Sequence, residues 1–263
     1  VALLRQAELP GLSAAAHAAR LRHNPARDVT YIVDRNINYT NICCATCSFC
    51  AFYRRRRDAD AYTLSFEELG RKIEETLALG GTQILLQGGM NPGLGVPEIE
   101  AMLRFIRREY PAIHIHGFSA PEIAVFARLS RLSIEETLRR LREAGLASIP
   151  GGGAEILVDR VRRELTRGKC GAAEWLDIHR QWHRLGGRST ATMMFGHIET
   201  LEDRVEHMLR VRELQDETGG FTAFILWTYQ PENTALQRER ALAEVGSWDY
   251  LRTLAVARLF LDN

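Results

Sequence analysis

The sequence predicts an α/β fold in which helices cover a parallel sheet. Short apolar stretches alternate six times with longer amphipathic stretches, and this alternation implies right-handed crossovers between parallel strands. The unusual loops, which are rich in cysteine, glycine, histidine or proline, each directly follow an apolar stretch. The functional loops of a β/α barrel follow its strands in this way. The pattern therefore fits a doubly wound sheet or part of a β/α barrel.

The six predicted strands are apolar runs that end in glycine or polar residues. The first of them runs directly into a cysteine-rich loop, and no dinucleotide-type glycine fingerprint follows it. Because all six unusual loops would then lie on one rim, the barrel is the favoured architecture. The strands are expected at residues 30–38, 82–89, 112–119, 146–156, 187–196 and 221–229.

The predicted helices carry recognisable start and stop signals. Ser65 with Glu68, and Ser133 with Glu136, have the spacing of a capping box. Pro111 closes one helix, and glycine pairs close others. Two further helical stretches are expected between the fourth and fifth strands. The other helices are expected at residues 65–81, 96–111, 133–145, 201–220 and 248–263.

The chain is expected to divide into two parts. Residues 1–28 predict a separate N-terminal helical lead-in, and residues 29–263 predict a (βα)6 barrel core. A closed barrel has eight strands, so this core would be two units short. The expectation is therefore a partial barrel that is truncated at its C-terminus.

Composition restricts the possible functions. With 34 basic and 33 acidic side chains the formal charge is +1, so no nucleic-acid partner is expected. No apolar run approaches the roughly 20 residues that span a bilayer, and the first residues do not resemble a signal peptide. Five cysteines, four of them within eight positions, are not typical of a secreted disulfide framework. They predict a metal site in a reducing cytoplasmic compartment.

The cysteine loop carries the most specific chemistry. Cys43, Cys47 and Cys50 have the spacing C-x3-C-x2-C, and three thiolates can hold three irons of a 4Fe-4S cluster while the fourth iron keeps an open position. A structural zinc site normally needs four protein ligands, and no histidine follows Cys50 within 60 residues. Zinc and a pair of redox cysteines remain the alternatives, and the cluster is favoured over both.

A strand, a C-x3-C-x-aromatic-C loop and a partial β/α barrel together resemble the radical S-adenosylmethionine (SAM) superfamily. The resemblance implies a partial TIM barrel in which the amino and carboxylate groups of SAM chelate the open iron. One electron from the cluster would cleave SAM to methionine and a 5′-deoxyadenosyl radical. The superfamily spacing selects Cys43 as a ligand and leaves Cys44 as a bystander, although Cys44 with Cys47 and Cys50 would give C-x2-C-x2-C.

The same resemblance implies cofactor contacts on two of the other segments. Gly88 and Gly89 match the first two residues of a Gly-Gly-Glu motif that holds the methionine amino group, while Met90 replaces the glutamate. Phe49, the aromatic residue before Cys50, is also expected at the cofactor. Without the cysteines, the two glycines would read equally well as a turn after a strand.

Two carboxylates receive cofactor roles by the same resemblance. Glu155 follows the fourth strand, where members of the superfamily place a polar residue against the ribose or methionine part of SAM. Gly196 and Glu199 match a degenerate form of the adenine-contacting motif G-x-I-x-G-x-x-E. Carboxylates that favour the dipole at a helix start are the alternative interpretation for both glutamates.

The third rim loop supplies the candidate catalytic residues. His114 and His116 alternate along one strand and face the same side. His116, near the rim, and Glu122, in the following loop, are candidates for binding a carboxylate or accepting a proton, and a histidine satisfied in the core is the usual alternative. The run from Arg54 to Arg57 is interpreted as a solvated loop.

Segments across nearly the whole chain resemble the menaquinone (futalosine-route) and deazaflavin branch of the superfamily, and most of all the cyclic dehypoxanthine futalosine synthase family. Aminofutalosine synthases tend to have histidine where this chain has Asn36, and deazaflavin (FO) synthase subunits tend to have Thr-Ala in place of Gly152-Gly153. The segments are DRNINYTNICCATCSFCAFYR, HIHGFSAPEI, SIPGGGAEILVDRVR, TATMMFGHIET and LQDETGGFTAFILWTYQPENTAL.

The resemblance implies a reaction on dehypoxanthine futalosine, a ribose tethered to a benzoate. The deoxyadenosyl radical would abstract hydrogen from ribose C4′, and the carbon radical would add to the ring of the same molecule. A flavodoxin- or ferredoxin-like electron donor and no membrane partner are implied. The alternatives are an aminofutalosine synthase or FO synthase subunit of the same branch, or a metal-stabilised barrel that binds without catalysis.

Overall fold

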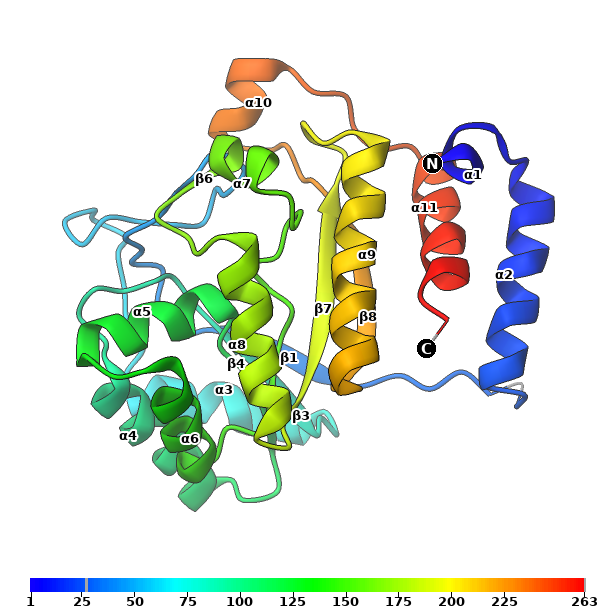
Figure 1. Cartoon of the computed structure of the whole chain (residues 1–263). Helices are drawn as coiled ribbons and strands as arrows, with labels where there is room; N and C mark the ends of the chain where they lie inside the picture. Colours follow the sequence, from blue (N-terminus) through cyan, green and yellow to red (C-terminus); the bar gives the residue numbers. More distant parts are fainter. Residues whose placement is uncertain (27, 263) are drawn as a thin grey trace.

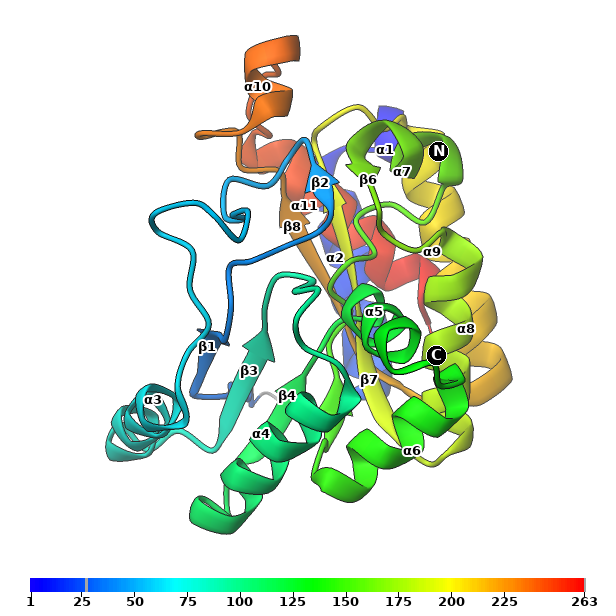
Figure 2. The ribbon, with the colours of Figure 1, turned by 90° about the vertical axis from the view of Figure 1, so that its left-hand side faces the viewer.

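The computed structural model describes residues 1–26 and 28–262. A six-stranded, entirely parallel sheet curls into a half-barrel (Figure 1, Figure 2). This confirms the predicted α/β partial barrel, and all six predicted strands are present. In spatial order, which is also their order along the chain, they are β1 (Asp34–Asn38), β3 (Gln83–Gln87), β4 (His114–Gly117), β5 (Ser148–Ile149), β7 (Arg188–Phe195) and β8 (Phe221–Thr228).

Helices between the strands cover the convex side of the sheet (Figure 1). Both halves of the capping box of Ser65 and Glu68 form, and the Ser133 hydroxyl accepts from the Glu136 amide at 3.1 Å. Among the described residues, no helix is both long and apolar enough to span a membrane. The covering helices are α3 (Phe66–Ala78), α4 (Val96–Glu109), α5 (Ala120–Ser130), α6 (Ile134–Ala144), α7 (Asp159–Leu165), α8 (Ala172–Arg184) and α9 (Leu201–Thr218), with α10 (Ala235–Arg240) and α11 (Ser247–Phe260) after β8.

Three of these features were not predicted. The segment that begins at Ser119 is helix α5, because proline fits the first helical turn and Ser119 with Glu122 forms a capping box. Helix α10 is capped by Thr234, whose hydroxyl accepts a hydrogen bond from the amide of Gln237 at 3.2 Å. A two-stranded antiparallel sheet of β2 (Thr46–Cys47) and β6 (Thr166–Arg167) joins the cysteine loop to the segment after α7.

The core lies between the sheet and its helices. On β3, Ile84 and Leu86 are fully buried towards the helices, whereas Gln83 and Gln87 are partly exposed on the other face. Trp175 and Trp182 of α8 fill the same core. The concave face therefore carries the polar members of the strands and is available for a ligand.

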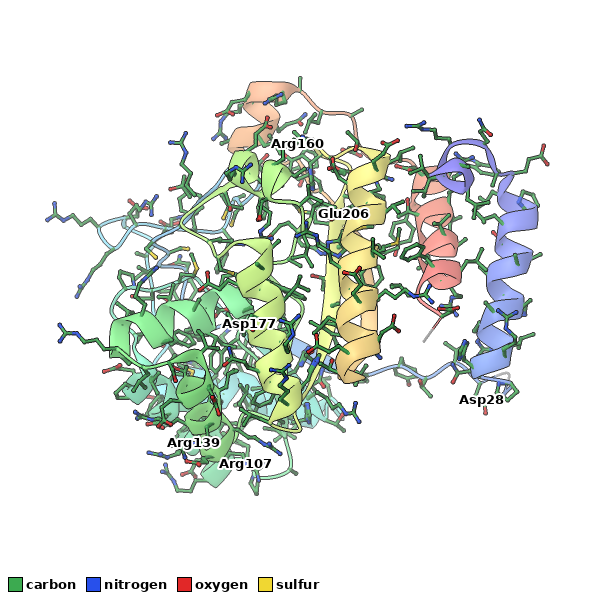
Figure 3. The ribbon with its side chains drawn as sticks, in the orientation of Figure 1. Asp28, Arg107, Arg139, Arg160, Asp177 and Glu206 are labelled. Carbon is green, nitrogen blue, oxygen red and sulfur yellow. The ribbon has the colours of Figure 1, made fainter. Side chains whose placement is uncertain are left out.

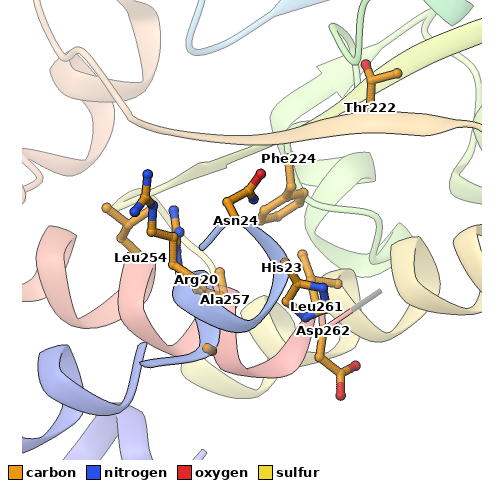
Figure 4. A pocket seen from close by; sticks show the side chains of 11 residues that line it. Arg20, His23, Asn24, Thr222, Phe224, Leu254, Ala257, Leu261 and Asp262 are labelled. Carbon is orange, nitrogen blue, oxygen red and sulfur yellow. The ribbon is translucent and has the colours of Figure 1, made fainter. Parts of the chain in front are cut away.

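The N-terminal residues form α1 (Ala2–Gln6) and α2 (Leu9–His23), and α2 packs on α11 (Figure 1). Leu4 and Leu12 share an apolar cluster with residues of β7 and α11. A cleft lies where α2, β8 and α11 meet (Figure 4). Arg20, which lines this cleft, already donates hydrogen bonds to the backbone carbonyls of residues 26 and 28. The division of the chain at residue 28 into an N-terminal lead-in and a barrel core stays a prediction.

One ion pair between helices gives a test of this packing. Glu100 of α4 accepts two hydrogen bonds from Arg140 of α6, at 2.9 and 2.6 Å, with only 8% of its side chain exposed. We expect Glu100→Gln to lower the free energy of unfolding at pH 7 by about 1–3 kcal/mol, because the partly exposed Arg140 guanidinium loses its charged partner on a buried carboxylate. Urea unfolding measures this difference.

The same pair has a defined pH dependence. The hydrogen bonds from Arg140 lower the pKa of Glu100 below its ordinary value of 4.5, so its stabilisation is present above that pH and is lost as the pH falls through the lowered value. The deficit of Glu100→Gln should therefore shrink in acid. Glu143→Gln is the control, because Arg139 and Glu143 form an exposed pair on α6 (Figure 3). An equal loss in both variants would contradict the prediction.

Candidate active site

The loops predicted to carry function lie at the C-terminal ends of the parallel strands, on one rim of the half-barrel. The cysteine loop follows β1, and the Gly88–Gly89 turn follows β3. Helix α5 follows β4 directly, the glycine loop follows β5, and the segment that begins at Gly196 follows β7. Parallel strands end at a common edge, so these five segments become neighbours.

The cysteine loop turns three of its four thiols inward. Cys43, Cys47 and Cys50 pack with Phe49 around buried apolar side chains that include Met90, whereas Cys44 is exposed. The Met90 amide donates to Cys43 Sγ at 3.4 Å, and its carbonyl accepts from the Cys44 amide at 2.9 Å. The structure therefore brings together the three predicted ligands and separates Cys44 from them.

Two of the inward thiols, Cys43 and Cys47, are held in a protonated state by their surroundings. Burial raises the pKa of Cys47 to about 12, and it also raises the pKa of Cys43. A metal must replace these protons when it binds. Among the described residues, no three His, Cys, Asp or Glu side chains converge closely enough to hold one ion. Three thiols on one loop can bind three irons of a cluster, whereas a closed zinc site needs a fourth protein ligand, so this donor set fits the cluster better.

Residues 54–57 form a largely exposed loop, as predicted, but its first two arginines also bind the chain. Arg55 donates to the Cys43 carbonyl and to Thr46 Oγ1, each at 2.7 Å. Arg54 pairs with Asp60 at 2.6 Å and donates to nearby backbone carbonyls. These two side chains hold the backbone of the cysteine loop in place. A run of arginines gives no local signal for this role.

The Gly88–Gly89 turn packs directly under the cysteine loop. A Cβ on Gly88 would lie 2.8 Å from the Tyr39 ring, and one on Gly89 would overlap the Ile42 carbonyl. Only glycine allows such close backbone approach. A hydrogen bond also holds the turn in place, because the Gly88 amide donates to the Glu122 carboxylate at 3.0 Å.

Glu122, a predicted candidate for proton transfer, is fully buried and has four donors. Its carboxylate accepts from Tyr39 Oη at 2.7 Å, from the Ser119 amide and hydroxyl at 2.8 and 2.6 Å, and from Gly88. Burial raises the pKa of Glu122, and the hydrogen bonds oppose that rise. In this arrangement Glu122 links β1, β3 and α5 and positions the glycine turn.

Glu155 lies beside the cysteines with a partly buried cation, Lys169, that sequence reasoning missed. Lys169 Nζ is 2.8 Å from Glu155 Oε1 and 5.2 Å from the centre of the Phe49 ring. Arg162 Nη1 is 3.6 Å from Glu155 Oε2, an atom that is buried and makes no hydrogen bond with any described residue. Burial alone would lower the pKa of Lys169, but the carboxylate of Glu155 raises it above its ordinary value. The one feature of the sequence that singles out Lys169 is the rarity of lysine, since the chain has only two lysines.

Glu199 is also buried and organises the loop after β7. It accepts from the amides of Gly196 and His197 at 2.7 and 2.8 Å and from Arg204 Nε at 2.9 Å. Gly196 has φ +88°, a conformation that favours glycine. Arg204 continues to Asp249 of α11 at 2.9 Å. Residues 196 and 199 thus form a rigid turn whose carboxylate is fully engaged.

His116 lies inside the half-barrel, below the rim. His114 and His116 share the Ser148 hydroxyl, each at 2.7 Å. Burial, reinforced by His114, lowers the pKa of His116 to about 4, so the ring is neutral at pH 7. His116 Nε2 makes no hydrogen bond within the described residues. The pairing of the strands and the alternation of side chains along them place further polar side chains on the concave face of the sheet, beside His116. These are Asn36, Asn38, Gln83, Gln87, Thr190 and Thr192.

Comparison with known proteins agrees with this geometry. Residues 37–211 match the radical SAM superfamily. The chain is 43% identical to the cyclic dehypoxanthine futalosine synthase of Halalkalibacterium halodurans over 263 residues and 44% identical to that of Streptomyces coelicolor over 264 residues. It is 42% identical to the aminodeoxyfutalosine synthase of Thermus thermophilus over 263 residues. These alignments cover 99–100% of this chain and 65–70% of those proteins.

The fold has a solved counterpart. The crystal structure of methylornithine synthase superposes with a TM-score of 0.77 at 17% sequence identity, over 99% of this chain and 71% of that one. The superfamily match spans the end of β1, the cysteine loop and the strands β3, β4, β5 and β7. The chain belongs to the radical SAM superfamily.

Proposed function

We propose that the chain is a radical SAM cyclase that converts dehypoxanthine futalosine to its cyclic product in menaquinone biosynthesis. The observation that carries this proposal is the arrangement of three thiols that face inward beside the buried carboxylate of Glu155. One oxygen of that carboxylate makes no hydrogen bond with any described residue. Similarity over the whole chain to two cyclic dehypoxanthine futalosine synthases supports the choice of reaction. Cys43, Cys47 and Cys50 would hold the 4Fe-4S cluster, with one iron left for SAM.

When bound, the cluster and SAM supply a carbon-centred radical that takes hydrogen from the substrate ribose. The chain's own part is to bind and orient the two molecules. Lys169 offers a cation for a carboxylate, and Glu155 Oε2 offers a free acceptor for an ammonium or hydroxyl group. SAM carries all three kinds of group. Phe49, Gly88 and Gly89 would line the same site, as the resemblance implies.

The concave face suits a ribose joined to an aromatic ring. Polar side chains from β1, β3 and β7 can bind ribose hydroxyls. Ile225 and Trp227 of β8 pair with Thr192 and Met194 of β7, so they share this face, and 39% of Trp227 is exposed there. We infer that the benzoate ring packs on Trp227. Holding ribose carbon and ring in contact is the main catalytic contribution of such a site.

After the ribose radical has added to the ring, loss of one electron, which the oxidised cluster would accept, and of one proton would restore aromaticity. His116 is neutral and has an unused ring nitrogen, so it is the better proton acceptor of the two candidates. Glu122 already receives four hydrogen bonds and positions the glycine turn instead. The adenine-contacting role of Gly196 and Glu199 stays a proposal based on the superfamily motif.

Sibling reactions of the same branch are the alternative functions. Identity does not separate them, because the aminodeoxyfutalosine synthase is nearly as similar as the cyclases. Two sequence features favour the cyclase, namely Asn36 and the Gly152-Gly153 pair. A Cβ on Gly152 would overlap the end of the Gln87 side chain, so a threonine there requires that side chain to move. We also propose a flavodoxin- or ferredoxin-like electron donor and a cytoplasmic location, where four clustered thiols stay reduced.

The cysteine series tests the metal site. After anaerobic reconstitution with iron and sulfide, we expect Cys43→Ala, Cys47→Ala and Cys50→Ala to lose most bound iron and the cluster absorbance. Cys44→Ala should retain both, because Cys44 faces solvent. Iron and sulfide analysis with absorption spectra measures this. Loss in Cys44→Ala with retention in Cys43→Ala would overturn the ligand assignment and select the alternative spacing.

The charged pair beside the cluster gives a second test. We expect Lys169→Gln and Glu155→Gln to weaken SAM binding by about 10- to 100-fold, because each removes a charge-assisted contact of about 1.5–3 kcal/mol. Cluster content should be unchanged. Calorimetric titration of SAM into reconstituted protein measures the affinity. Glu164→Gln is the matched control, since Glu164 is exposed and pairs with Arg240; a similar loss there would show that the effect is not local.

Product analysis decides between the sibling reactions. With SAM, dithionite and dehypoxanthine futalosine, we expect deoxyadenosine and the cyclic product in equal amounts. Deoxyadenosine without the cyclic product would exclude the cyclase and favour a sibling enzyme. Reconstituted protein with a cluster that neither binds nor cleaves SAM would instead indicate a barrel that binds without catalysis.

A further inference from the structure

A serine joins two histidines on the concave face of the sheet. His116 Nδ1 and His114 Nε2 each lie 2.7 Å from the Ser148 hydroxyl oxygen. Both histidines belong to β4, and Ser148 is the partner of His116 on the neighbouring strand β5. The three side chains therefore form a continuous line of hydrogen bonds along this face. We call them the histidine–serine triad.

The two ends of the histidine–serine triad have different surroundings. His116 is partly buried and Ser148 is buried, whereas His114 is exposed. His114 is the first residue of β4, and the starts of barrel strands lie at the end opposite to the rim that carries the functional loops. The triad thus leads from the interior of the half-barrel to solvent, away from the cysteine loop.

The Ser148 hydroxyl gives the triad a direction. A hydroxyl has one proton and can donate it to only one of two ring nitrogens, so it accepts an N–H from the other ring. With His116 donating from Nδ1, its Nε2 carries a lone pair, and Ser148 donates to His114 Nε2. Neither His116 Nε2 nor His114 Nδ1 makes a hydrogen bond with any described residue. One end of the triad can therefore accept a proton while the other end releases one.

A positive charge on His116 is unfavourable. Burial, reinforced by His114, lowers the pKa of His116 to about 4. A base with such a pKa accepts a proton only weakly at pH 7 if it must keep that proton. Passing its other ring proton to Ser148 in the same step keeps the ring neutral. The hydrogen bond to Ser148 thus removes the main obstacle to proton acceptance by His116.

Two charged side chains lie on either side of the triad. Asp34 of β1 is level with His114 in the sheet, because both are in register with Gln83. The carboxylate of Asp34 opposes the effect of burial on the pKa of His116, so it favours the arrival of a proton at this end. Arg188 of β7, on the other side, is directed to a backbone carbonyl, to which it donates.

We propose that the histidine–serine triad is a proton relay that carries the proton of the substrate ring from His116 to solvent at His114. This inference rests on the proposed function, since it needs a substrate ring that loses a proton. His116 faces the substrate, whereas Ser148 and His114 act through His116. The relay lets the reaction proceed while water is excluded from the concave face.

One ring proton enters the triad and one proton leaves it. The ring C–H bond breaks and its proton binds His116 Nε2, while the Nδ1 proton of His116 passes to Ser148 Oγ. The Ser148 hydroxyl proton passes to His114 Nε2, and the Nδ1 proton of His114 leaves to water. The electron that the ring adduct loses goes to the oxidised cluster, as in the proposed function. After the product leaves, water reaches His116 and the triad returns to its starting tautomers.

The tautomer of His116 tests the direction of the relay without substrate. Nitrogen NMR of the full reconstituted chain, with labelled histidine and an oxidised cluster, distinguishes a proton on Nδ1 from one on Nε2. We expect the Nδ1–H form of His116 in the unaltered chain. Ser148→Ala should shift the ring towards Nε2–H, the form that a free histidine side chain prefers. Ser148→Thr keeps the hydroxyl and should keep the Nδ1–H form.

Product analysis tests the function of the relay. With SAM, dithionite and dehypoxanthine futalosine, Ser148→Ala and His114→Ala should still cleave SAM to deoxyadenosine, because hydrogen abstraction precedes the loss of the proton. The amount of cyclic product per deoxyadenosine should fall by about tenfold or more in both variants. Ser148→Thr should retain the ratio of the unaltered chain, and added imidazole should restore it in His114→Ala. His17→Gln is the control, since His17 is exposed on α2.

Four results would overturn the relay. They are an Nε2–H form of His116 in the unaltered chain, an unchanged product ratio in Ser148→Ala, an equal fall of the ratio in Ser148→Thr, or an equal fall in His17→Gln. Failure of the proposed function has a different signature, namely deoxyadenosine without any cyclic product from the unaltered chain. The tautomer of His116 does not depend on turnover, so the two failures are distinguishable.

Discussion

The site depends on one constraint, which is that a loop with almost no regular structure must hold three thiols in fixed positions. Four kinds of contact meet this requirement. The β2–β6 ladder pins Cys47, Arg55 binds the carbonyl of Cys43, and the backbone of Met90 holds Cys43 and Cys44. The glycine turn then fits under the loop because it has no side chain.

Several predicted functional carboxylates hold the rim together. Glu122 joins β1, β3 and α5, and Glu199 fixes the turn after β7 and extends through Arg204 to α11. Because both carboxylates are fully engaged, their effect on a ligand acts through the backbone that they position. Glu155 differs, since one of its oxygens makes no hydrogen bond with any described residue and a partly buried lysine lies beside it. We therefore expect Glu155 to contact a ligand directly, whereas Glu122 and Glu199 support the structure of the rim.

Local sequence patterns predicted the six strands and their parallel order and selected the three cysteines that the structure turns inward, because alternation, capping and cysteine spacing are short-range signals. The structure added what depends on distant residues. Nothing near Arg55 indicates that it folds back on Cys43, and nothing near Lys169 indicates its pairing with Glu155. The β2–β6 ladder was missed for the same reason, since each strand is two residues long and they are 120 positions apart. Helix α5 was locally readable from Ser119 and Glu122, but those residues were assigned to a catalytic loop.

The central claim is that the cysteine loop holds a cluster with one iron open to SAM. Electron paramagnetic resonance of the dithionite-reduced, reconstituted chain tests it most directly, before and after SAM is added. The account predicts the signal of a one-electron-reduced 4Fe-4S cluster whose shape changes when SAM binds. A cluster signal that SAM leaves unchanged, or a chain that binds only zinc, would contradict it.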